Sequence, residues 1–96
     1  MKKMKRKIFM FAAVMMTVLP SVVNAELVGK YSWGYFYSIM NDKQVISECD
    51  PTGATKVQAI AVGKKRIEGP WTNNHKASIA KAERAKSGNR TGYDVK

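Results

Sequence analysis

A two-residue alternation of aromatic side chains is the feature that most narrows the fold of this chain. It lies in the segment 30–40, KYSWGYFYSIM. Side chains of an extended strand point alternately to its two faces, so every second residue shares a face. One face would then carry Tyr31, Trp33, Tyr35 and Tyr37, and the other Ser32, Gly34, Phe36 and Ser38. The pattern predicts a strand with an aromatic face, of which we expect at least half to lie in a core.

Turn signals on either side of short β-branched runs predict further strands. Asn41-Asp42-Lys43 has turn chemistry and would join the aromatic strand to a second strand at 44–48 as a hairpin. A second turn is indicated at 50–53, where proline and glycine suit the corner positions. A third strand follows at 54–62 with both faces partly apolar, which suggests that it is covered on two sides or lies at a subunit contact.

In the remainder of the chain, glycine, proline and basic residues indicate turns and loops. Residues 63–66 form a turn with three successive positive charges, and Gly69-Pro70 interrupts the chain again. Residues 87–92 read as a loop, after which 93–95 would be a last edge strand.

The segment 76–86, KASIAKAERAK, permits two interpretations. Its alanine, lysine, glutamate and arginine residues favour a helix by propensity. A helix here would present mostly alanine to a core, and the segment also alternates as a strand would, in agreement with the strands before it.

The N-terminus predicts export. Five basic residues and no acid precede the apolar run 8–19, Pro20 breaks that run, and Val23-Asn24-Ala25 suits a signal peptidase. The alternative, a retained membrane anchor, needs about 20 apolar residues, and the run is shorter. We therefore expect a cleaved signal peptide at 1–25 and a secreted domain at 26–96.

The expected mature domain is small and moderately basic. Twelve basic and seven acidic residues give residues 26–96 a net charge of +5, which favours anionic partners such as a bacterial envelope. We expect no nucleic-acid partner. A core of this size contributes only about 3–5 kcal/mol. Cys49 is the single cysteine, so no internal disulfide adds to it. Cys49 either is a free, unreactive thiol or bridges two chains in a homodimer.

Catalytic and metal-binding constellations are not recognisable. His75 and Cys49 would need an orienting group and an oxyanion hole that the sequence does not identify, and no paired Cys or His has metal-ligand spacing. We therefore expect no catalysis, cofactor or metal. A binding surface remains, and the candidate target-binding residues are the aromatic Tyr31, Trp33, Tyr35 and Trp71 and the basic Lys64, Lys65 and Arg66.

The opening Gly29-Lys30-Tyr31-Ser32-Trp33-Gly34 resembles the start of mature bacteriocins of the lactococcin 972 family. The order of later features is similar too, and consists of Ser38, the Ala54-Thr55-x-Val57 segment, Trp71 after Gly69, the alternating alanines Ala77, Ala80 and Ala82, Gly88-Asn89, and Tyr93. The resemblance covers most of 27–95. The chain departs from the family at 40–50, where it carries acids and Cys49 in place of an aromatic- and histidine-rich stretch.

The resemblance implies an all-β fold, a small antiparallel β-sandwich, in which the segment from Lys76 is a strand. It also implies an unmodified antibacterial protein, secreted by a Gram-positive cell, that engages the cell-wall precursor lipid II of related bacteria and blocks septum formation. Contact with the membrane surface and dedicated immunity and export membrane proteins would accompany that role.

Two other classes of function fit the residues. One is a non-lethal envelope-binding or adhesion module whose basic turn binds an anionic wall polymer. The other is a secreted enzyme inhibitor, or an enzyme that uses His75.

Overall fold

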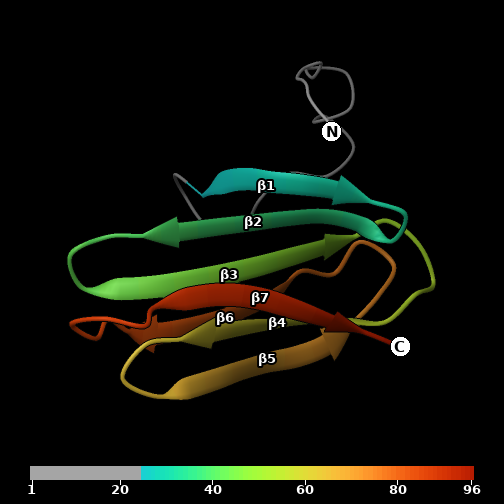
Figure 1. The fold of residues 1–96 in the computed structure, drawn as a ribbon. Coiled ribbons are helices and arrows are strands. Elements are labelled where there is room, and N and C mark those ends of the chain that lie inside the picture. Colours follow the sequence, from blue (N-terminus) through green and yellow to red (C-terminus); the bar gives the residue numbers. More distant parts are fainter. Residues whose placement is uncertain (1–24) are drawn as a thin grey trace.

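The structure, a computed structural model, describes residues 25–96, and the residues 1–24 of the predicted signal peptide lie outside that range. Seven strands make up the described chain (Figure 1), namely β1 Glu26–Tyr31, β2 Gly34–Met40, β3 Gln44–Pro51, β4 Val57–Val62, β5 Arg66–Thr72, β6 Ser78–Glu83 and β7 Arg90–Val95. No part of this range is helical. All seven strands lie within the predicted mature domain.

The strands form two antiparallel sheets. The first has the order β1-β2-β3-β6 and the second β5-β4-β7. The sheets stack as the two layers visible in Figure 1, with β3 and β6 of one facing β4 of the other. The protein is therefore a small all-β sandwich, as expected. Its core consists of Trp33, Phe36, Val45, Cys49, Val57, Ala59, Ala61, Ala80 and Ala82, with Ile67 and Tyr93 packed against it.

Two serine hydroxyls connect the sheets at opposite sides of the sandwich. The Ser47 hydroxyl of β3 donates to the Gly92 carbonyl of β7 at 2.8 Å. The Ser78 hydroxyl of β6 donates to the Pro70 carbonyl of β5 at 2.5 Å. The sandwich is thus closed by hydrogen bonds in addition to side-chain packing.

The predicted aromatic strand is in fact two strands. The chain turns at Ser32 and Trp33, so that Tyr31 of β1 pairs with Gly34 of β2. Gly34 has a φ of 146°, and a Cβ there would lie 2.2 Å from the Asp50 carbonyl, so only glycine fits at the start of β2. The single aromatic face was therefore wrong: Trp33 and Phe36 enter the core, while Tyr35 and Tyr37 form a separate cluster.

Strand β6 settles the ambiguous segment 76–86. Ser78, Ala80 and Ala82 are buried and Lys81 and Glu83 are exposed, which is the alternation of a strand with one covered face. The register places Ala80 beside Ser47 and Ala82 beside Val45. Alanine is large enough here because β6 packs closely between β3, β4 and β5. The helix favoured by propensity would have offered too little apolar surface to this core.

Two of the predicted turns extend into strands, and so does the predicted loop 87–92, because Arg90, Thr91 and Gly92 already belong to β7. Asp50 and Pro51 belong to β3, where Pro51 pairs with Gly34. Arg66 begins β5, which also contains Gly69-Pro70, the expected interruption. Strand β5 lies at the edge of its sheet, where the missing amide of Pro70 costs no ladder hydrogen bond.

The connections gather at two opposite ends of the sandwich (Figure 1). At one end the 32–33 turn, the 52–56 and 73–77 loops and the C-terminus meet, through Thr52 N–H donating to Trp33 O at 2.9 Å and Asn74 N–H to Gly53 O at 2.8 Å. We call this the aromatic end. At the other lie turns 41–43 and 63–65 and the start of the β6–β7 loop, which we call the basic end. Lys64 N–H donates there to Glu83 O at 2.8 Å and Arg84 N–H to Lys43 O at 2.9 Å.

Candidate functional site

An aromatic cluster of Tyr31, Trp33, Phe36 and Tyr93 lies at the aromatic end, where the β1–β2 turn meets β7. The Tyr31 and Trp33 rings stack with centroids 5.5 Å apart, and Tyr93 lies 5.0 Å from Trp33 and 5.2 Å from Phe36. Burial, and then the neighbouring Tyr31, raises the pKa of the Tyr93 hydroxyl. Trp33 is only 6% exposed whereas Tyr31 is 38% exposed. Of the two predicted contacts here, Trp33 is a core residue and Tyr31 is the one that a ligand can reach.

Tyr35, the third predicted aromatic contact, lies on the other face of the first sheet. Residues two positions apart on a strand share a face and neighbours point to opposite faces, so Tyr35 and Tyr37 point away from Phe36 and the second sheet. Their rings are 6.5 Å apart, and Ala25 packs against them. Glu48 and Asp50 of β3 pair with these tyrosines and are buried as well. Burial, and then the adjacent Glu48, raises the pKa of the Asp50 carboxyl above its usual range.

Trp71, the fourth aromatic candidate, lies on the outer face of the second sheet. It is 37% exposed, and the Lys96 ammonium lies 4.4 Å from the centre of its ring. Gln58 is the cross-strand neighbour of both Trp71 and Asp94. An exposed indole with flanking polar groups can stack on a sugar or an apolar ring, provided that Lys96 moves aside.

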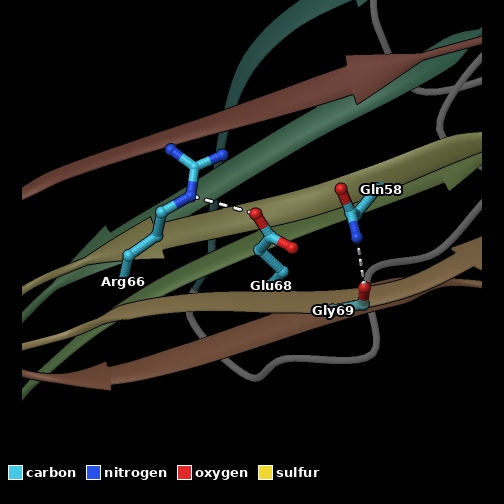
Figure 2. A network of polar contacts seen from close by, with 4 residues as sticks. All are labelled: Gln58, Arg66, Glu68 and Gly69. Carbon is cyan, nitrogen blue, oxygen red and sulfur yellow. Dashed lines mark hydrogen bonds and ion pairs between the residues drawn. The ribbon is translucent and has the colours of Figure 1, made fainter.

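The predicted basic triplet divides between two locations. Lys64 Nζ lies 3.8 Å from Glu83 Oε1 across the basic end. Arg66 Nε instead donates to Glu68 Oε2 at 3.0 Å along β5, beside Gln58, whose amide donates to the Gly69 carbonyl at 3.0 Å (Figure 2). Lys65 is exposed at the tip of the turn. Of the three, Lys64 lines the same hollow as cationic residues of other segments.

The structure does not bring the seven candidate residues together. Arg66 and Trp71 lie at opposite ends of β5, about 17 Å apart for five residues of extended strand. Tyr31, Trp33 and Trp71 lie toward the aromatic end, and the basic triplet lies at the basic end. Tyr35 lies on a different face again. The sequence therefore combined residues that the fold places at different ends and on different faces.

Lys43 and Arg84 are the charged residues of the basic end that the sequence interpretation missed. They line a hollow together with Lys64, and the other lining residues are Asn41, Asp42, Gln44 and Glu83. The sequence feature that could have pointed to Lys43 was Asn41, which stands at the start of the turn. Its side-chain oxygen accepts from the amides of Lys43 and Gln44 at 2.8 Å each, which fixes the turn that carries Lys43.

Cys49 and His75 have opposite environments. Cys49 is fully buried between the sheets, and burial, followed by the charges of Asp50 and Glu48, raises the pKa of its thiol to about 12. His75 is exposed in the 73–77 loop with a φ of 68°, where its amide donates to the Pro51 carbonyl at 2.8 Å. A thiol in this environment is not a nucleophile at neutral pH and is not accessible to a second chain.

Within residues 25–96 no group of three or more His, Cys, Asp or Glu side chains is arranged to hold a metal ion. The same range contains no helix long and apolar enough to cross a membrane.

Comparison with known proteins gives no relative. No protein-family model, no curated protein and no solved structure matches the chain.

Proposed function

We propose that residues 26–96 are a secreted antibacterial protein of the lactococcin 972 type, which acts at the envelope of related Gram-positive bacteria. In this proposal the target is the cell-wall precursor lipid II, and its capture blocks septum formation. Neither a cofactor nor a catalytic step is required, because binding alone withdraws the precursor.

The observation that carries the proposal is strand β6. Local propensity favoured a helix over 76–86, whereas the resemblance implied a strand. Residues Ser78–Glu83 form a strand that completes the four-stranded sheet. The alternation of this segment also allowed a strand, and the resemblance required one, so the strand agrees with a similarity that extends along the chain.

The surface proposed for target recognition is the aromatic end. Tyr31 and Trp71 are its large exposed aromatic side chains. The buried Trp33 ring stacks against the Tyr31 ring. A defined precursor must be distinguished from other anionic envelope components by shape and stacking, which exposed aromatic rings supply better than mobile lysine charges.

Purified residues 26–96, spotted on lawns of related Gram-positive bacteria, test the proposal. A β-type circular dichroism spectrum first establishes that the preparation is folded. The expected result is a clear zone, which addition of purified lipid II to the spot reduces. A folded preparation that clears no lawn across a wide panel would reject the antibacterial role.

The same preparation distinguishes the second candidate, a non-lethal envelope-binding module. Sedimentation with isolated cell walls measures binding without reference to killing. Binding to walls with no inhibition of growth would favour the module, and the buried aromatic residues would then be structural only.

A further inference from the structure

The basic end contains a preformed hollow that the proposed recognition surface does not use. It is open to solvent, its lining residues are all exposed, and its volume is about 760 Å³. It is bounded by the β2–β3 turn, the β4–β5 turn and the residues that end β6. Segments about 20 residues apart in sequence thus contribute to one concave surface.

Backbone hydrogen bonds hold this hollow in shape. Lys64 N–H donates to Glu83 O, and Arg84 N–H donates to Lys43 O, so both turns are attached to the end of β6. At Gly63 the approach is so close that a Cβ would lie 2.0 Å from the Glu83 carbonyl oxygen. The frame therefore needs no rearrangement before a ligand binds, which reduces the entropy lost on binding.

Three cationic residues line the hollow, one from each segment, namely Lys43, Lys64 and Arg84. Arg84 Nη1 donates to the Asn41 carbonyl at 2.8 Å, which fixes the guanidinium and leaves its other N–H groups available. In the part of the chain that the structure describes, Lys43 and Arg84 take part in no ion pair. The acids of the lining are Asp42 and Glu83, of which Glu83 lies 3.8 Å from Lys64. Both partners of that ion pair are well exposed, so solvent screens it and a stronger anion can displace it.

We propose that this hollow binds a phosphate group, through the guanidinium of Arg84 and the ammonium groups of Lys43 and Lys64. A phosphate oxygen pair matches the planar donors of an arginine, and the two lysines supply the remaining charge. The phosphate belongs to a lipid headgroup or to a soluble phosphate compound, both of which offer the same chemistry. The site lies at the end opposite Tyr31 and Trp71. Phosphate binding there can be measured whether or not the protein kills bacteria.

The test compares two double variants of residues 26–96 that remove the same charge from opposite ends. Lys43→Gln with Lys64→Gln empties the hollow of its lysines. Lys56→Gln with Lys76→Gln, both exposed near the aromatic end, is the matched control. Binding to vesicles of phosphatidylglycerol in phosphatidylcholine is measured by sedimentation, and amide chemical shifts are recorded by NMR during titration with inorganic phosphate.

The expected result is a loss of vesicle affinity of about 25-fold for the first variant, or fivefold per lysine, and less than about threefold for the control. Shifts caused by inorganic phosphate should concentrate at 41–44, 64 and 83–84. Phosphate-induced shifts at these residues, with or without the selective loss of vesicle affinity, support a site for phosphate as such. A selective loss of vesicle affinity without those shifts assigns the site to a lipid headgroup. Equal losses in the two variants, or shifts scattered over the lysines of both ends with no difference on vesicles, would overturn the proposal.

Discussion

Cys49 is the residue whose chemistry the fold changes most. An exposed cysteine has a pKa near 8.5 and reacts readily as its thiolate. The core raises the pKa of the Cys49 thiol to about 12, since burial disfavours the thiolate and the acids Asp50 and Glu48 oppose its charge. The single cysteine of the domain is therefore a core side chain.

This environment predicts slow thiol modification. At pH 8.5 the folded protein should react with an aromatic disulfide reagent at least about a hundredfold more slowly than the same protein in guanidinium chloride, because both ionisation and access are suppressed. The absorbance of the released thiolate measures the two rates. Equal rates would show that Cys49 is exposed, and a disulfide-linked dimer in the purified protein would contradict its burial.

Gly63 is the residue on which the shape of the basic end depends most. Substitution by alanine should lower the free energy of unfolding by about 1–3 kcal/mol, since the new methyl group collides with the Glu83 carbonyl and forces the turn away from β6. Urea denaturation measures the change. Gly53→Ala is the control, because open space surrounds that glycine, and its effect should stay within about 0.5 kcal/mol. Equal effects of the two substitutions would mean that the turn does not contact β6.

At the scale of the strands, Ser78 compensates for an irregularity in β4. The pairing of β4 with β5 shifts between Gln58 and Ile60, so Ala59 has no partner in β5. Its amide donates instead to the Ser78 hydroxyl at 3.0 Å, and that hydroxyl donates to Pro70 O. One side chain of β6 thus satisfies polar groups of two strands in the other sheet.

Loss of this hydroxyl should be costly. Ser78→Ala leaves the buried Ala59 amide without an acceptor, so thermal or urea denaturation should show a loss of about 1–3 kcal/mol in the free energy of unfolding. Ser87→Ala, at an exposed loop position, is the matched control and should change stability by less than about 0.5 kcal/mol. A neutral Ser78→Ala variant would contradict this account of how the sheets are joined.

The sequence predicted the strands correctly where the two-residue periodicity was unbroken. It failed to predict strands whose limits depend on tertiary contacts. The strands 44–48 and 54–62 were anticipated from β-branched runs between turns, and they correspond to β3 and β4. Strand β1 was missed because Tyr31 continued the aromatic alternation, and only the contact of Gly34 with Asp50 shows that the chain turns there. Strand β5 was missed because Gly69-Pro70 ends most strands, and an edge position tolerates it.

The candidate site was predicted less well for a related reason. Residue type identified exposed Tyr31 and Trp71 and the basic turn, but no local pattern shows that Trp33 is buried or that Tyr35 lies on the opposite face. Lys43 and Arg84 join Lys64 only through the pairing of distant strands. The fold thus separates residues that the sequence had suggested form a single surface.

At the scale of the whole molecule, the sandwich is a spacer between two chemically different ends. The aromatic end offers exposed rings and the basic end a cationic hollow. Because the two ends lie apart, we expect substitutions at one end to leave the contacts of the other in place.

The most direct test of the account is the minimum inhibitory concentration of residues 26–96 and two folded variants on a sensitive strain, at low and at high salt. Tyr31→Ala with Trp71→Ala should raise this concentration about tenfold or more at both salt concentrations, because stacking contacts are little screened. Neutralising Lys64, Lys65 and Arg66 to glutamine should raise it only about two- to fivefold, and mainly at low salt, because these charges lie away from the aromatic end and their attraction to the envelope is screened by salt. If the neutralised protein is inactive while the folded aromatic variant retains full potency, the assignment of recognition to the aromatic end is wrong.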